Sequence, residues 1–460
     1  MNNVAKVMIF FFLKIFFAQF RKILNMYVQH FDIQCKNKKN ASRGFLYFCT
    51  QKLKMQKQFF YLLLLALLTA FSASAQKKTF RNIRFSQHDF VDTVKIKIWD
   101  GAVIIPVEIN GEVKNLMFDA GANWGFWIGN EENWMKPAGD SLTVYDSQKA
   151  KKKMAVFRMP PIKMGNTTIE NYPLVVDNAL ADMVCDKIDG AFGFDLVTCG
   201  LSFKFDTKDS LMIVTDRKGF FSKEEKRQPK LKYEPYKSYY MVSPLVWVDF
   251  PWGRAKMIFD LGCVGGWVDI PEPFLKRWSE DHPKIRQKIT DYTVDIDTSI
   301  TTSAGLFGRS EDTMLYRRLH FPEITMGDLA LHDLWISTNS RMIKTGSAVL
   351  ERTSLIIDGP KKWFVFLPHD GNKEIVVGNE NKKGVTHTFA VPNDTLGAVK
   401  AVVRKGSEAY QKGIRTGDYL ISVNGVPITD YCTYLNLVES GEMKRCVYRT
   451  PEGEIKEVEW

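Results

Sequence analysis

Leu116-Met-Phe-Asp-Ala-Gly-Ala-Asn-Trp-Gly-Phe-Trp-Ile128 is the stretch from which this chain can best be interpreted, because the chain contains a second version of it. About 140 residues later it reads Met257-Ile-Phe-Asp-Leu-Gly-Cys-Val-Gly-Gly-Trp-Val-Asp269. In each stretch an apolar strand runs into Asp-x-Gly and continues into an apolar segment that contains tryptophan. A carboxylate directly after apolar residues is costly to bury unless it has a partner or a function. The sequence therefore predicts that Asp119 and Asp260 are partners of each other.

Two further landmarks repeat in the same order, which argues against a chance match. Pro161-Ile-Lys-Met-Gly165 is echoed by Pro322-Glu-Ile-Thr-Met-Gly327, and each is followed by a glycine and then by a strand that ends in aspartate. Residues 80–218 and 233–370 both alternate apolar and polar residues over short runs bounded by turn residues, which is typical of β-strands. We expect an all-β protein with two homologous lobes, 80–218 and 233–370, each providing one aspartate.

The last part of the chain has a different pattern. Charged residues 219–232 and polar residues 371–384 are predicted to be linkers. In residues 385–460, Gly397-Ala-Val-Lys-Ala-Val-Val403 precedes a short predicted helix, a Gly417-Asp418 turn, a strand and Asn424-Gly425. This pattern resembles a PDZ domain. The resemblance implies a small α+β module that takes up an extended peptide as an added strand, with the region around Leu396-Gly397-Ala398 as our candidate for its carboxylate-binding loop.

The net charge of +11 is unevenly distributed. Residues 1–54 contain ten lysines and arginines but only one acidic residue, whereas from Gln76 onward 52 basic residues face 51 acidic ones. The chain after Gln76 is nearly neutral, so no nucleic-acid partner is predicted.

Residues 55–75 have the pattern of a secretory signal peptide: a basic start, the short apolar run Phe59–Phe71, and Ala73-Ser74-Ala75 before Gln76. We therefore expect export to a periplasm or to the exterior, without a transmembrane segment in the mature chain. Residues 1–54 are interpreted as an upstream, non-native extension, with an internal signal anchor preceded by a basic cytoplasmic arm as the alternative.

Five cysteines follow Gln76. Cys185 and Cys199, or Cys432 and Cys446, could form disulfides in an oxidising compartment, since each pair is fourteen residues apart. Cys263 lies inside the second Asp-x-Gly turn, where it is interpreted as a small turn residue and not as a nucleophile. Neither the cysteines nor the seven histidines have metal-ligand spacing, so no metal or cofactor is expected.

Both lobes resemble those of bacterial retropepsin-like aspartic proteases that carry a C-terminal PDZ domain, and the resemblance covers nearly all of residues 80–460. It implies that Asp119 and Asp260 are catalytic, within the active-site loops Ala120, Gly121, Ala122 and Leu261, Gly262, Cys263. In that family a later apolar strand ending in glycine packs against each loop; Ala191-Phe192-Gly193 fits this description, and Lys344-Thr345-Gly346 fits it less well. Two lobes in one chain would complete the site without a homodimer.

Paired carboxylates suit peptide hydrolysis, because two close carboxyls cannot both ionise and one proton stays between them. Such a pair can activate water and protonate the leaving nitrogen. The family's hydroxyl residue after each aspartate is replaced here by Ala120 and Leu261. The prediction is therefore an exported aspartic endopeptidase acting on peptides or unfolded chains, with its PDZ domain docking them. The alternative is a catalytically inactive, protease-like scaffold that binds peptides.

Overall fold

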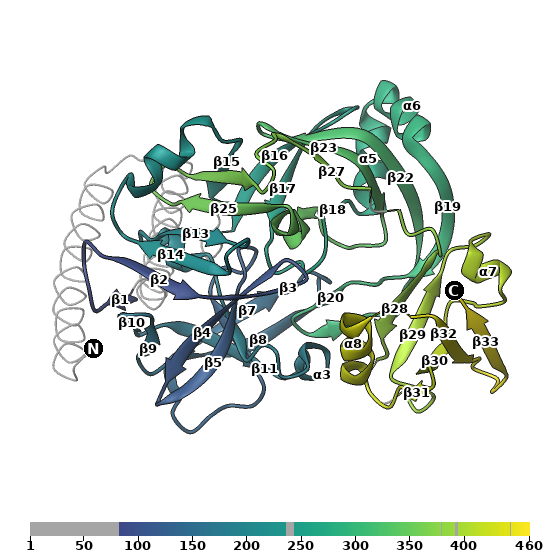
Figure 1. Cartoon of the computed structure of the whole chain (residues 1–460), viewed down its shortest axis with the longest axis horizontal. Coiled ribbons are helices and arrows are strands. Elements are labelled where there is room, and N and C mark those ends of the chain that lie inside the picture. Colours follow the sequence, from purple (N-terminus) through teal and green to yellow (C-terminus); the bar gives the residue numbers. More distant parts are fainter. Residues whose placement is uncertain (1–81, 236–242, 379, 392–393, 442) are drawn as a thin grey trace, which may run out of the picture. The chain divides into compact units, whose positions relative to one another are not determined.

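The computed structural model describes residues 82–235, 243–378, 380–391, 394–441 and 443–460 (Figure 1). The predicted extension 1–54 and signal peptide 55–75 lie outside the described residues. Within the described part of the chain, no helix is both long and apolar enough to span a bilayer. The described residues are predominantly β-structure, as the alternating pattern predicts.

The first half of the structure, residues 82–218, is built around a strongly twisted sheet. Its strands follow the order β1-β10-β9-β4-β5-β12-β6-β11-β8-β7, with β3 paired to β4. They are β1 (Arg84–Phe85), β3 (Lys97–Trp99), β4 (Ala102–Ile109), β5 (Glu112–Phe118), β6 (Gly125–Ile128), β7 (Lys136–Tyr145), β8 (Lys151–Arg158), β9 (Ile162–Met164), β10 (Thr167–Glu170), β11 (Pro173–Asp177) and β12 (Gly190–Phe192). The short helices α3 (Ala181–Val184) and α4 (Asp195–Thr198) flank β12.

Strands from both halves meet in one sheet, in the order β15-β26-β25-β13-β14-β2. They are β2 (Val91–Lys95), β13 (Ser202–Asp206), β14 (Leu211–Thr215), β15 (Lys230–Pro235), β25 (Thr353–Asp358) and β26 (Trp363–Pro368). β13 and β25 are the two aspartate-terminated strands of the sequence repeat, and they pair directly with each other. All six residues of β25 are buried, so this shared sheet is part of the core that joins the halves.

The second half, residues 219–378, adds a further group of paired strands and two helices. They are β16 (Pro244–Phe250), β17 (Gly253–Phe259), β18 (Val268–Asp269), β19 (Thr293–Ile300), β20 (Ala304–Gly305), β21 (Gly308–Arg309), β22 (Thr313–Met326), β23 (Leu329–Ser337), β24 (Lys344–Thr345) and β27 (Glu374–Val376), with α5 (Glu272–Asp281), α6 (Pro283–Tyr292) and the 3-10 turn η2 (Ser347–Glu351).

The two segments predicted to be linkers contain regular structure. Residues 219–232 include the 3-10 helix η1 (Phe220–Arg227) and the first residues of β15, and Phe221 is only 1% exposed. Residues 371–384 include β27, which pairs in parallel with β23. Runs of charge mark the solvent-facing side of these segments and do not reveal the one or two apolar side chains that attach them.

The C-terminal domain, residues 385–460, has its own hydrophobic core. Its strands are β28 (Val385–Phe389), β29 (Val399–Val403), β30 (Tyr419–Val423), β31 (Val426–Pro427), β32 (Arg445–Arg449) and β33 (Ile455–Glu459). Its helices are α7 (Glu408–Gln411) and α8 (Tyr431–Ser440). Ser407 accepts a hydrogen bond from Tyr410 N, and Asp430 accepts one from Thr433 N, so each helix begins at a capping side chain.

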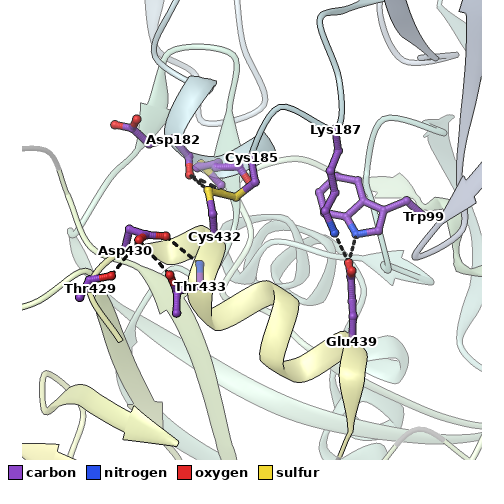
Figure 2. Close-up of a disulfide and its surroundings, with 10 residues drawn as sticks. Trp99, Asp182, Cys185, Lys187, Thr429, Asp430, Cys432, Thr433 and Glu439 are labelled. Atoms are coloured by element: carbon purple, nitrogen blue, oxygen red, sulfur yellow. Dashed lines mark hydrogen bonds and ion pairs between the residues drawn. A yellow bond between two sulfur atoms is a disulfide. The ribbon is translucent and has the colours of Figure 1, made fainter. Parts of the chain in front are cut away.

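A disulfide attaches this domain to the first half of the structure. It joins Cys185, directly after α3, to Cys432 in the first turn of α8 (Figure 2). Both pairings suggested by the fourteen-residue spacings are therefore wrong. Cys199, which is exposed, and Cys446, which is buried in the core of the C-terminal domain, are not disulfide-bonded.

A polar contact lies beside the disulfide. Trp99 Nε1 donates a hydrogen bond of 2.8 Å to Glu439 Oε1 at the end of α8, and Lys187 forms an ion pair with the same carboxylate (Figure 2). The disulfide and this contact hold both ends of α8 against the first half.

Candidate active site

Asp119 lies directly after β5, in a turn supported by a parallel strand. β12 runs parallel to β5, with Ala191 beside Met117 and Phe192 beside Phe118. Asp119 N donates to the carbonyl of Phe192 over 2.9 Å. β6, which leaves the turn, pairs with the other side of β12 in antiparallel direction.

Asp260 follows β17 in the same arrangement. β24 runs parallel to β17, with Lys344 beside Ile258 and Thr345 beside Phe259. β18, which leaves the turn, pairs with the other side of β24 in antiparallel direction. The repeated sequence thus corresponds to a repeated three-strand arrangement that ends each time at an aspartate.

The two turns face each other closely. A Cβ atom placed on Gly121 would lie 2.4 Å from Oδ1 of Asp260, and one placed on Gly262 would lie 2.4 Å from Cγ of Asp119. Each glycine therefore leaves the space that the opposite carboxyl occupies. The structure brings together Asp119, Asp260 and the two glycines, all of which the sequence singled out.

Backbone N–H groups fix both carboxyls. Oδ1 of Asp119 accepts hydrogen bonds from Gly121 N at 2.8 Å and Ala122 N at 3.0 Å. Oδ1 of Asp260 accepts one from Gly262 N at 3.0 Å. Burial first, and the negative charge of Asp260 second, raise the pKa of Asp119 to about 8. One proton therefore resides on the pair at neutral pH.

Ala120 and Leu261, which replace the expected hydroxyl residues, are both 0% exposed and belong to the main hydrophobic core. Hydrogen bonds from elsewhere hold the turns instead. Ser243, just before β16, donates from Oγ to the Gly121 carbonyl over 2.9 Å. Gly265 N, after the second turn, donates to the carbonyl of Asp100 over 2.9 Å. Each turn is thus tied to the other half of the chain.

Sequence reasoning missed the most unusual residue of the site, Lys344. Its Nζ lies 3.0 Å from Oδ2 of Asp260, and its side chain is 8% exposed. Burial opposes a charge here, but the neighbouring acidic groups, Asp260 before Cys263 and Asp269, outweigh burial and raise the pKa of Lys344 well above its usual value. The only sequence signal was that Lys344-Thr345-Gly346 fits poorly as an apolar strand.

Cys263 lies beside this ion pair and remains a thiol. Its Sγ contacts Oδ2 of Asp269 over 3.8 Å. Burial raises the pKa of Cys263 to about 12, with Lys344 acting in the opposite direction. A thiol with so high a pKa is a poor nucleophile. In the part of the chain that the structure describes, no three His, Cys, Asp or Glu residues are grouped so that they could hold a metal ion.

Two hairpin tips meet next to the aspartate turns. Ser147 Oγ, at the tip between β7 and β8, donates to the Ala304 carbonyl over 3.0 Å. Phe307 N, between β20 and β21, donates to Oδ2 of Asp146 over 3.1 Å. Phe307 packs in the same apolar cluster as Trp124 and Val264, the residues that follow the two turns. The tip of the β20-β21 hairpin thus shares an apolar cluster with the segments that follow the two aspartate turns.

The C-terminal domain contacts the segment that follows the β20-β21 hairpin. Lys400 Nζ on β29 lies 2.8 and 3.0 Å from the two carboxylate oxygens of Glu311, which follows β21. The same ammonium pairs with Asp394 at 2.9 Å. An ionic contact therefore links the C-terminal domain to the hairpin next to the aspartates.

The C-terminal domain also offers an edge strand beside a helix. Among the described residues, β28 pairs only with β29. The rings of His387 and Phe389 on β28 lie 5.5 and 5.8 Å from those of Tyr434 and Tyr431 on α8. An added peptide strand would pair with β28 alongside α8. Leu396-Gly397-Ala398 lies between β28 and β29, and its role as the carboxylate-binding loop stays a prediction.

Gly121→Ala and Gly262→Ala are expected to separate the two carboxyls. Overpacking costs roughly 1–3 kcal/mol, which thermal denaturation should detect as a lower Tm. Because the charge of Asp260 would move away, the pKa of Asp119 should also fall, as followed by carbon-13 NMR of the aspartate carboxyls. Gly441→Ala is the control, since a Cβ there meets nothing within 4 Å. An unchanged Asp119 titration in both variants would contradict the assigned contact.

The C-terminal domain is expected to lose stability in acid. Burial, and then the charge of Lys383, lower the pKa of His387 from 6.5 to about 4. Between pH 6.5 and pH 4, His387 is protonated in the unfolded chain but not in the folded domain. The stability that His387 contributes is therefore fully present above pH 6.5 and is lost as the pH falls through the folded pKa of about 4. Urea unfolding at pH 7 and pH 4.5 should show a smaller difference for His387→Phe than for the wild type or for a change at the exposed His88. Equal differences in all three proteins would argue against this role.

Comparison with known proteins identifies one family. Residues 401–447 match the model of the PDZ domain. The match begins in β29 and ends in β32, and it includes α7 and α8, which confirms the sequence prediction for this part of the chain. No curated protein is significantly similar to the chain.

Proposed function

We propose that this protein is an aspartic endopeptidase built from two protease-like lobes, in which Asp119 and Asp260 form the catalytic pair. The proposal proceeds from the PDZ domain, which indicates a role in binding peptides or other proteins. The observation that carries it further is the reciprocal packing of the two Asp-x-Gly turns, each glycine against the opposite carboxyl. The repeated arrangements β5-β12-β6 and β17-β24-β18 support a two-lobed, pseudo-two-fold organisation.

One proton shared by two carboxyls supplies both functions that peptide hydrolysis needs. The ionised carboxylate takes a proton from water as the water oxygen adds to the peptide carbonyl carbon. The protonated carboxyl donates its proton to the carbonyl oxygen. Proton transfer to the nitrogen then accompanies cleavage of the C–N bond, which leaves a new carboxyl and a new amine. The raised pKa of Asp119 keeps this singly protonated state populated at neutral pH.

The C-terminal domain would bind the peptide substrate or a regulatory peptide along β28 and α8. Its contact with Glu311 places that event next to the hairpin between β20 and β21. We also propose that the protein is exported. The disulfide between Cys185 and Cys432 suits an oxidising compartment, in agreement with the signal peptide expected from the sequence.

A peptide-binding scaffold without catalysis is the second candidate. The ion pair between Lys344 and Asp260 favours it, because a cation offsets the charge that a catalytic carboxylate would use. The apolar side chains of Ala120 and Leu261 point in the same direction. In this alternative the aspartates serve only to hold the two halves together.

A peptide-library assay separates the two candidates. The purified chain is incubated between pH 3 and pH 9 with peptides of mixed sequence, and mass spectrometry identifies new termini. The endopeptidase proposal expects cleavage at defined peptide bonds around neutral pH. Binding of peptides by the wild-type protein with no cleavage at any pH would instead establish the scaffold.

A further inference from the structure

One difference between the two halves lies in the parallel strand that supports each aspartate turn. Ala191 pairs with Met117, which precedes Asp119 by two residues. Lys344 pairs with Ile258, which precedes Asp260 by two residues. Ala191 and Lys344 therefore occupy equivalent positions in the parallel strands that support the two turns. Ala191 is 1% exposed and contributes only a methyl group. Lys344 extends from its strand to Asp260. The pair is therefore supported by an apolar residue on one side and by a cation on the other.

The titratable groups around this cation come from three segments of the chain. The turn after β17 contributes Asp260 and Cys263, and β18 contributes Asp269, which lies opposite Lys344 in the antiparallel register. The turn after β5 contributes Asp119, whose pKa Lys344 lowers by less than Asp260 raises it. Burial first, opposed by Lys344, raises the pKa of Asp269, and Cys263 is a thiol. Of the two central carboxyls, Asp260 is the one that Lys344 contacts directly.

We infer that Lys344 is a positioning residue that keeps Asp260 ionised and thereby places the shared proton of the pair on Asp119. The inference rests on the proposed endopeptidase function for its catalytic meaning. A contact of 3.0 Å between an ammonium and a carboxylate strongly favours the ionised carboxylate where water is excluded. Among the residues that the structure describes, Asp119 forms no ion pair with a lysine or an arginine. The geometry therefore distinguishes two groups that would be nearly equivalent in a symmetric pair.

This assignment gives the groups separate roles. Asp260 would accept the proton from water, and Asp119 would donate its proton to the peptide carbonyl oxygen. It also sets a direction for the pH dependence. A nearby cation makes both protons of the pair easier to lose, so removal of Lys344 moves the acidic and the alkaline limb of the activity profile to higher pH. With Lys344 present, the singly protonated pair persists to lower pH.

Titration of the wild-type carboxyls tests the inference directly. The full chain is labelled with carbon-13 at the aspartate carboxyls, and Asp119→Asn and Asp260→Asn assign the two signals. At pH 6 we expect Asp260 to be ionised and Asp119 to be protonated. The reverse order, or both carboxyls ionised at this pH, would overturn the inference even if no variant of Lys344 folds.

Variants then test the cause. Lys344→Met keeps the length of the side chain without its charge, Lys344→Ala reproduces the residue of the first half, and Lys344→Arg keeps the charge. For Met and Ala we expect protonation of the pair and the acidic limb of kcat/KM to move up by at least one pH unit, a tenfold loss below the limb. Arg should retain the wild-type profile. An equal loss of kcat/KM at all pH values would indicate a purely structural role and would overturn the inference.

The two proposals fail in different ways. The wild-type protein could cleave no peptide and still show the expected titration and its shift in Lys344→Met. That result would refute the endopeptidase proposal and leave the protonation assignment intact. If cleavage depends on Asp119 and Asp260 but Lys344→Met leaves the titration unchanged, only the role of Lys344 is refuted.

Discussion

Asp260→Asn and Asp119→Asn should each reduce kcat/KM for the proposed peptide cleavage by roughly a thousandfold or more, because each removes one of the two carboxyls to which the proposed mechanism assigns proton transfer. Asparagine keeps the size of the side chain and can still accept the hydrogen bonds from Gly121, Ala122 or Gly262. The loss should therefore appear in kcat and not in folding. Initial rates across pH on a single fluorogenic peptide would measure it.

Asp358→Asn is the matched control. Asp358 is also buried, at 2% exposure, and is also paired with a lysine, since Lys361 Nζ lies 3.0 Å from its Oδ2. It ends β25 and lies outside the two aspartate turns. Its replacement should lower stability without a specific loss of kcat. Cleavage that survives in both Asp119→Asn and Asp260→Asn would refute the paired-aspartate mechanism.

Asp119→Asn should also change stability in a pH-dependent way. The folded pKa of about 8 lies above the ordinary aspartate value of 3.8, so the stability linked to this group is present in acid and lost as the pH rises through the folded value. A neutral amide removes that loss. The midpoint of thermal unfolding at pH 9 should therefore be higher for Asp119→Asn than for the wild type. Such a gain would agree with a site that tolerates a costly carboxyl for a function.

The close approach of the two aspartates could be predicted because each aspartate lies in a recognisable local sequence pattern. An apolar strand that ends in Asp-x-Gly identifies a turn, and two copies of it suggest that they meet. Lys344 lies 84 residues from Asp260 in the sequence and reaches it only because β24 runs parallel to β17. Two parallel strands are joined by a long connection, and the length of that connection sets how far apart in the sequence the paired residues lie. A local sequence pattern therefore does not predict which residues pair.

Ser243 was missed for the same reason. It lies 122 residues from the Gly121 carbonyl that it contacts, and nothing in its sequence surroundings distinguishes it from an ordinary serine before a strand. The family pattern placed the supporting hydroxyls directly after the aspartates, where this chain has Ala120 and Leu261. Hydrogen bonds from across the halves take over this support, which a comparison confined to the Asp-x-Gly loops does not reveal.

The cysteine pairing illustrates a second limit. Equal spacings of fourteen residues suggested local disulfides, but Cys446 points into the core of the PDZ domain and Cys432 lies at the start of α8. The bond that forms spans 247 residues, because α3 and α8 come together only when the C-terminal domain docks. Sequence spacing cannot determine a contact that depends on how two domains associate.

Loss of this disulfide should destabilise the docked protein substantially. Closing a loop of 247 residues restricts the unfolded chain strongly, and we expect Cys185→Ser/Cys432→Ser to cost roughly 2–5 kcal/mol of unfolding free energy. Glu439 and Lys400 would still hold the C-terminal domain, but only through polar contacts that weaken with salt. Salt should therefore loosen the domain in the variant more than in the wild type, as measured by hydrogen exchange at α3 and α8.

Cys199→Ser and chemical reduction complete the comparison. Cys199 is exposed and lies outside the bond, so its replacement should leave the unfolding free energy within error of the wild type. Dithiothreitol should lower the stability of the wild type and of Cys199→Ser to that of the double variant, and should have no effect on the double variant itself. If reduction leaves the wild type unchanged, the bond does not contribute to stability. The ion pairs at Glu439 and Lys400 would then suffice to keep the PDZ domain next to the first half and the β20-β21 hairpin.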